Sequence, residues 1–108
     1  MTQRETELLE QSQSENAKTS IEATVALCKE ILFPRGDYEK AEFLLLEKVG
    51  LQGSIFGYIL ELTLGEAYIS MKEISRAKRF LEIAQSSEEE TIRTKATELI
   101  TFIDATEE

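Results

Sequence analysis

One stretch of this 108-residue chain repeats another at a fixed distance, and this repetition limits the folds that the chain can adopt. The segment GDYEKAEFLLLEK (36–48) aligns with KEISRAKRFLEIA (72–84) at an offset of 36 residues. Three pairs of apolar or small residues coincide in this alignment: Tyr38 with Ile74, Ala41 with Ala77, and Leu45 with Leu81. A repeat of this length holds one pair of helices, which cannot bury its apolar face alone, so consecutive pairs are expected to stack on each other.

Helical periodicity predicts about five helices and no strand. We expect these helices at about 20–33, 38–49, 54–71, from after KEIS (72–75) to about 85, and from 87 to about 103. Loops of two to five residues make neighbouring helices antiparallel. The expected fold class is therefore all-α, an antiparallel array of helix pairs.

Capping and helix-breaking residues support these helix boundaries. Thr19 or Ser20 is expected to cap the first helix, and Pro34 to end it, because proline disfavours helical geometry in the residue before it. The glycines of GLQG (50–53) are expected to end the second helix. Ser54 is expected to cap the third helix.

The first 19 residues lack the apolar pattern of the rest of the chain. They are rich in Gln, Ser, Thr and Glu, and Leu8 and Leu9 are their only large apolar pair. We therefore expect a flexible polar tail at 1–19. One helical domain follows at 20–106, built from two helix pairs and a closing helix.

Gly65 lies inside the most apolar of the expected helices, where a glycine costs roughly 1 kcal/mol relative to alanine. Because Gly65 and Ala77 lack side-chain bulk, we expect the two helices of this pair to approach closely there. Tyr68 and Leu81 would fill the space beside the contact. A helix kink at Gly65 is the alternative interpretation.

The balance of charges disfavours two classes of partner. The chain carries 21 acidic and 12 basic residues and a net charge of −9. Nucleic acids and anionic membrane surfaces require concentrated Lys and Arg, so neither is expected as a partner. A basic patch on another protein would be favoured, mainly through faster encounter.

The residue types also argue against catalysis. The chain has no His to serve as a general base or zinc ligand, so no metal site, no cofactor and no catalytic residue is expected. Cys28, the only cysteine, falls on an apolar helix face and is expected to be a buried thiol. It cannot form a disulfide within the chain, which favours a reducing compartment, and we expect a cytoplasmic protein. The apolar stretch 54–71 contains two glutamates and is expected to be a buried helix, not a membrane span.

The second copy of the repeat resembles the tetratricopeptide repeat family. The residues that carry the resemblance are Leu64, Gly65, Tyr68, Ala77, Leu81 and Ala84. The first copy matches it less fully, at Gly36, Tyr38, Ala41 and Leu45. Cys28 and Lys29 replace its Leu-Gly pair, Lys48 replaces a small residue, and Glu61 occupies a usually apolar place in the second copy.

The resemblance implies a concave groove lined by the first helix of each pair. Carried over to this chain, the groove residues are Ala23, Ala26, Leu27, Glu30, Ile59, Leu62, Thr63, Glu66, Arg93, Ala96, Thr97 and Ile100. The Lys, Asn and Arg with which some family members clamp a peptide carboxylate are largely absent from these places. The remaining surface is apolar and acidic, and suits an amphipathic helix or peptide of another protein with a basic flank.

Three hypotheses for the function remain open. In the first, the chain is an adaptor that holds a partner helix on Ile59, Leu62 and Ile100 and orients it with Glu30 and Glu66. In the second, the chain is a structural subunit that homodimerises through its apolar helices. For the apolar residues of the expected groove, contact with one another inside a small bundle is the alternative to a groove. A third hypothesis, by analogy of size and architecture only, is a secretion-system chaperone for an aggregation-prone subunit.

Overall fold

The computed structural model describes residues 2–52 and 57–106, with the backbone alone at 50–52. Within these ranges the chain is helical and has no strand, which confirms the all-α class. The elements are α1 (Gln3–Ser12), α2 (Ala17–Leu27), the π-helical turn η1 (Cys28–Leu32), α3 (Phe33–Arg35), α4 (Tyr38–Gln52), α5 (Ile59–Ser70), α6 (Ile74–Ala84) and α7 (Glu90–Thr106). Because α2, η1 and α3 are continuous, the described residues form six helices, one more than expected.

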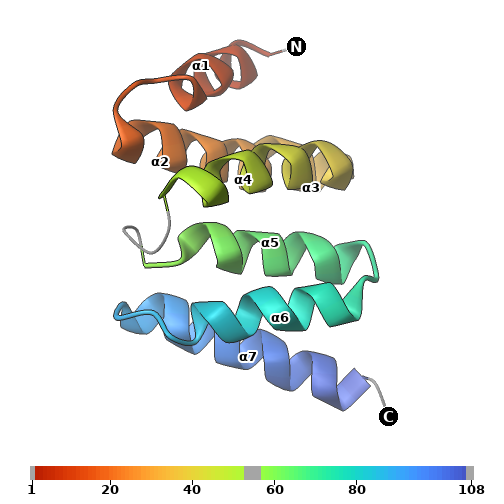
Figure 1. Ribbon diagram of the computed structural model, residues 1–108. Helices are drawn as coiled ribbons and strands as arrows, with labels where there is room; N and C mark the ends of the chain where they lie inside the picture. Colours follow the sequence, from red (N-terminus) through yellow and green to blue (C-terminus); the bar gives the residue numbers. More distant parts are fainter. Residues whose placement is uncertain (1, 53–56, 107–108) are drawn as a thin grey trace.

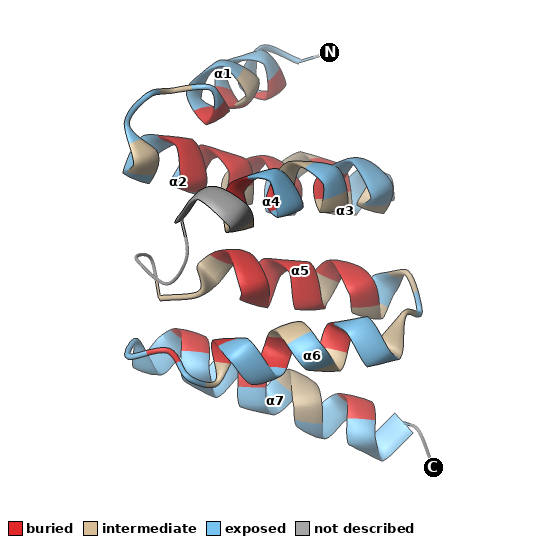
Figure 2. Cartoon of the chain, viewed as in Figure 1, coloured by how far each residue is buried: buried red, intermediate tan, exposed pale blue. Residues whose placement is uncertain are grey.

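The helices stack along one direction, from α1 at one end to α7 at the other, and the two termini lie at opposite ends (Figure 1). The molecule is elongated, with principal extents of 42 × 29 × 21 Å. Helix α5 contacts α4 and α6 and also touches α2 and α7, which makes it the central element. Its buried residues extend around most of its surface (Figure 2), as expected for a helix that is apolar nearly all round.

The repeated segments occupy equivalent places in the fold. Gly36 and Lys72 both have left-handed backbone, with φ of 81° and 63°, and α4 and α6 each begin two residues later. The next amides also match: Asp37 N donates to the Leu32 carbonyl at 2.8 Å, and Glu73 N to the Tyr68 carbonyl at 2.9 Å. The core positions Ala41, Leu45, Ala77, Leu81 and Ala84 are fully buried.

Gly65 permits the close approach of α5 and α6, as predicted. A Cβ atom placed on Gly65 would lie 2.5 Å from Leu81 Cδ2 and 3.5 Å from the Ala77 carbonyl oxygen. Helix α5 continues through Gly65 without a break. Tyr68 is buried beside this contact and stacks on Phe80, with ring centroids 5.7 Å apart.

The N-terminal segment corrects the prediction of a tail at 1–19. Thr2 caps α1, because its hydroxyl accepts a hydrogen bond from Glu5 N at 3.1 Å. Helix α1 packs on α2 and buries Glu5, Leu8 and Ser12. The hydrophobic pattern missed this helix because two of its three buried positions are polar.

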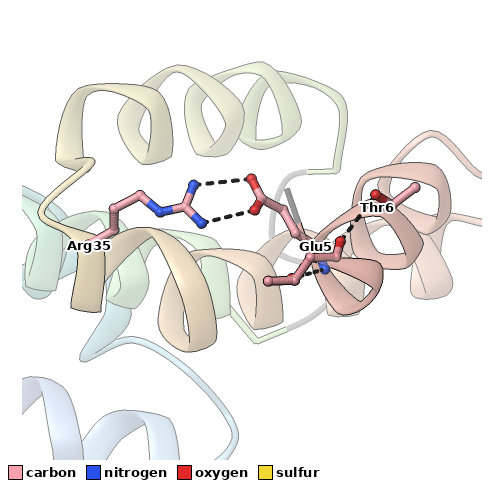
Figure 3. A network of polar contacts seen from close by, with 4 residues as sticks. Glu5, Thr6 and Arg35 are labelled. Atoms are coloured by element: carbon pink, nitrogen blue, oxygen red, sulfur yellow. Dashed lines mark hydrogen bonds and ion pairs between the residues drawn. The ribbon is translucent and has the colours of Figure 1, made fainter.

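Polar contacts hold α1 in place. The Glu5 carboxylate, whose side chain is 3% exposed, accepts two hydrogen bonds from the Arg35 guanidinium, at 2.9 and 3.2 Å (Figure 3). The guanidinium lowers the pKa of Glu5. At the other end, the Ser12 carbonyl accepts from Lys48 Nζ at 2.8 Å and from Ser20 Oγ at 2.7 Å. Lys48, which stands in place of an alanine, thus supplies a positive charge at the C-terminus of α1.

The first predicted helix is longer at both ends than expected. It begins at Ala17, because Asn16 Oδ1 accepts from Thr19 N at 3.0 Å and takes the capping role predicted for Thr19 or Ser20. It continues past Pro34 to Arg35 through the π-helical turn, in which Phe33 N donates to the Cys28 carbonyl. A wider turn moves aside the carbonyl with which a proline ring collides in an α-helix.

Two predictions near the glycines are also corrected. Helix α4 passes through Gly50 to Gln52, so GLQG does not end it at 49. The predicted cap Ser54 lies outside the described residues. Helix α5 begins only at Ile59, because Gly57 and Tyr58 have φ of 65° and 64°, a left-handed backbone that a right-handed helix cannot include.

Candidate partner-binding groove

A groove crosses the face on which α2, α5 and α7 lie next to one another. Helix α5 contacts both α2 and α7, and a cavity of about 500 Å³ opens over their N-terminal ends. Its lining residues come from all three helices and the loop before α7: Lys18, Ile21, Glu22, Val25, Ala26, Ile59, Glu89, Thr91 and Ile92.

The groove has an apolar floor because of residue spacing on the helices. Ile21 and Val25 are one turn apart on α2, and the small Ala26 beside them leaves space. Ile59 begins α5, and Ile92 comes from the first turn of α7.

The rim of the groove is charged. Lys18 and Glu22 lie on α2, and Glu89 lies just before α7. None of these three side chains forms a salt bridge within the part of the chain that the structure describes. Their charges are therefore available to groups outside the molecule.

The structure distributes the predicted groove residues between the surface and the core. Ala26 and Ile59 line the groove. Five others are buried between helices and offer no surface to a partner: Ala23, Leu27, Leu62, Thr63 and Ala96. Leu62, predicted as an anchor, is 3% exposed and belongs to the core.

The two glutamates predicted to orient a partner already have basic neighbours. Both oxygens of Glu30 accept from the Arg4 guanidinium at 3.2 Å, which lowers the pKa of Glu30. Glu66 lies 3.9 Å from Lys29 Nζ. Burial raises the pKa of Glu66, while the charges of Lys29 and Lys95 oppose that shift.

On α7, two of the predicted residues, Arg93 and Thr97, face away from the groove. Arg93 Nη1 donates to the Ser87 carbonyl at 2.9 Å, and the Thr97 hydroxyl accepts from Gln85 Nε2 at 3.1 Å, so both lie towards the end of α6. Ile100 is partly buried against the core. Ile92 lines the groove in place of Arg93, and the charge of Lys95 acts on Glu66 of α5, so the side of α7 that meets α5 is shifted by one residue from the carried-over pattern. Such a shift rotates a side chain by about 100° around the helix.

Sequence reasoning missed most of the lining, namely Lys18, Ile21, Glu22, Val25, Glu89, Thr91 and Ile92. The α2 residues were missed because the family pattern was applied to the second half of the helix. The spacing of Ile21 and Val25 was the available signal. On α7, Ile92 was missed through the one-residue shift from Arg93.

The described residues offer little reactive chemistry. Cys28 is fully buried, and burial raises the pKa of its thiol to about 12, so it stays protonated at neutral pH. Within residues 2–52 and 57–106, His, Cys, Asp and Glu nowhere gather in threes as a metal site requires. Over the same ranges, every helix is too short or too polar to cross a bilayer.

Comparison of the chain with protein-family models, with curated proteins and with solved structures gives no match. The geometry of the groove is therefore the basis for a functional proposal.

Proposed function

We propose that the chain is a protein-interaction module, with the architecture of a small tetratricopeptide-like adaptor, that binds an amphipathic helix or peptide of another protein. The observation that carries this proposal is the groove of about 500 Å³ over α2, α5 and α7, with an apolar floor and a charged rim that forms no salt bridge with any described residue. Apolar clefts with a few polar groups at the edge are typical binding sites. We propose no enzymatic role and no cofactor.

The residues of the groove define the partner's chemistry. A large apolar side chain of the partner would contact Val25 and Ile59 on the floor. A Lys or Arg on its flank would lie between Glu22 and Glu89, and the net charge of −9 would accelerate the encounter. The burial of apolar area supplies about 25 cal/mol per Å², so the floor provides the affinity. The charged rim sets the orientation of the partner.

A chaperone role is a variant of the same proposal. In that case the partner helix is aggregation-prone when free, and the groove covers its apolar face. The two roles differ in a measurable way. A chaperone delays the aggregation of its partner at equimolar concentration, whereas an adaptor leaves the rate of partner aggregation unchanged.

A pair of synthetic peptides tests the proposal. We would label a Leu/Lys amphipathic helix of about 18 residues, roughly 27 Å long, and a Leu/Glu peptide of the same length, and follow their fluorescence anisotropy. We expect the Leu/Lys peptide to bind. The double variant Glu22→Lys/Glu89→Lys should weaken binding about ten-fold or more, because it reverses both acidic groups of the rim. Val25→Arg should weaken it similarly by blocking the floor.

The control makes the same change in net charge at a different place on the surface. Glu82→Lys/Glu98→Lys changes two exposed carboxylates, on α6 and α7, that do not line the groove. We expect this variant to change affinity less than about twofold. Equal weakening by both double variants would mean that the peptide senses total charge alone, and the proposed site would be rejected.

A further inference from the structure

Helix α4 carries an apolar stripe that faces solvent. Phe43 is 67% exposed and Leu46 is 43% exposed, and the two lie one turn apart. They project from the side of α4 opposite to Ala41 and Leu45, which are fully buried. None of the α4 residues 38–49, whose side chains the structure describes, lines the groove, so this stripe is a separate surface.

Charged residues border the stripe in a definite order. Glu42 lies towards α6, where Arg76 Nη1 is 3.7 Å from its Oε2. Lys40 lies on the other side, close enough to Glu5 of α1 to help lower the pKa of that carboxyl. Glu47, seven residues after Lys40, shares its side of α4. Neither Lys40 nor Glu47 has a salt-bridge partner among the described residues.

We propose that this stripe binds the α4 stripe of a second copy of the chain, antiparallel, about a two-fold axis that passes beside Phe43. In a two-fold interface, a residue i of one copy that contacts residue j of the other is matched by a contact of j with i, and only a residue on the axis faces its own copy. Lys40 lies three residues before Phe43, and Glu47 lies four residues after it. Reversal of the second helix therefore places Lys40 of each copy opposite Glu47 of the other.

The arrangement satisfies the remaining residues of the stripe as well. The two Phe43 rings meet at the centre, where offset or edge-to-face contacts between aromatic rings are favoured. Leu46 lies on the side of the stripe away from Glu47, and after reversal it covers the aliphatic part of Glu39 of the other copy. The stripe is thus complementary to itself in both shape and charge, which is the reason for choosing a second copy as its occupant.

The net charge of −9 on each copy opposes this association. Screening of that long-range repulsion by salt should outweigh the weakening of two Lys–Glu pairs, because the Debye length is about 10 Å at 0.1 M. We therefore expect a reversible dimer that strengthens from low to moderate ionic strength. The groove on α2, α5 and α7 remains free in such a dimer.

Sedimentation of the full chain over a range of concentrations tests the interface. We expect a monomer–dimer equilibrium, and a dissociation constant at least about ten-fold higher for Phe43→Ser, because the central ring is lost. Phe102→Ser is the matched control, since it removes an exposed phenylalanine (55% exposed) from α7. That variant should dimerise like the wild type.

Charge exchange tests the two-fold arrangement itself. Lys40→Glu and Glu47→Lys should each weaken the dimer, because each sets like charges opposite one another twice. The double variant Lys40→Glu/Glu47→Lys should restore it. Circular dichroism confirms that each variant is folded. A wild type that stays monomeric at all concentrations, a dimer unaffected by Phe43→Ser, or a double variant no better than the single ones would each overturn the proposal.

Discussion

Gly65 is the residue on which the packing of the central helix pair depends. A methyl group there would overlap Leu81, with 2.5 Å between the Cβ and Leu81 Cδ2. We expect Gly65→Ala to destabilise the protein by about 1–3 kcal/mol from overpacking, partly offset by the roughly 1 kcal/mol gain in helix propensity. Gly65→Leu should be worse. Thermal unfolding followed by circular dichroism measures both.

A double-mutant cycle separates overpacking at Gly65 from other causes. Leu81→Ala alone should destabilise the protein by about 2–5 kcal/mol through the cavity it leaves. In the Leu81→Ala background, Gly65→Ala should be neutral or stabilising, because the atoms it would strike are gone. Strictly additive effects of the two substitutions would contradict the close-contact explanation.

Glu61 is a charged residue in a place that suits an apolar one. It is 5% exposed, its Oε1 has no hydrogen-bond partner among the residues that the structure describes, and burial raises its pKa above the ordinary 4.5. The folded state therefore favours the neutral form. This contribution to stability is fully present below the unfolded pKa and is lost as the pH rises through the folded pKa. Glu61→Leu should raise the free energy of unfolding at pH 7 by about 1–3 kcal/mol.

The pH dependence checks the assignment to Glu61. The stability gain of Glu61→Leu over the wild type should grow as the pH increases from about 4.5 towards neutral. Glu66→Gln is a parallel measurement, because burial also raises the pKa of Glu66 against the opposing charges of Lys29 and Lys95, so its effect on stability should change with pH in the same direction. A gain of equal size at every pH would show that Glu61 is not the titrating group.

Helix α1 is the element whose position depends most on polar contacts. In the pair of Glu5 with Arg35 the Glu5 side chain is 3% exposed and the Arg35 side chain 47% exposed, whereas both side chains of the Arg4–Glu30 pair are about half exposed. Exposed ion pairs contribute little, but removal of one partner of a buried pair is costly. We expect Arg35→Gln to accelerate hydrogen exchange in α1 at least about ten-fold while α5 stays protected. Arg4→Gln should change α1 exchange only slightly, and equal effects of the two would exclude a special role for Glu5.

The helices also show which parts of the fold the sequence pattern could predict. The offset of 36 residues predicted the equivalence of α4 and α6, because small and apolar residues must recur wherever helices meet in the same way. It could not predict α1, whose buried residues include Glu5 and Ser12, since polar burial depends on partners far away in the chain. The groove was only partly predicted, because a misalignment of one residue rotates each side chain by about 100° around its helix, which is enough to move it off the groove face.

At the scale of the whole molecule, the ends of the array are closed by polar faces. The outer side of α7 exposes Arg93, Thr94, Thr97, Glu98 and Thr101, and α1 at the other end exposes Thr6, Glu7, Glu10 and Gln11. Terminal helices with polar outer faces are what keep a stacked array from adding further units. Helices α1 and α7 therefore close the two ends of the array.

Replacement of polar residues on the outer face of α7 by apolar ones should allow other copies to dock at that end. Thr94, Glu98 and Thr101 recur at helical spacing, so Thr94→Leu/Glu98→Leu/Thr101→Leu creates a continuous apolar stripe. We expect this triple variant to associate with increasing concentration, seen as a rise in mass by light scattering, because an exposed apolar end can dock on other copies. The measurement uses the Phe43→Ser background, so that association through α4 does not contribute.

The alanine version of the same variant is the decisive comparison. Thr94→Ala/Glu98→Ala/Thr101→Ala raises the helix propensity of α7 without adding large apolar side chains, and should remain monomeric and at least as stable. If the leucine variant were also monomeric at every concentration, the polar face of α7 would not be what limits the array. In that case the shape of the α7 end, and not its polar side chains, would have to limit the length of the stack.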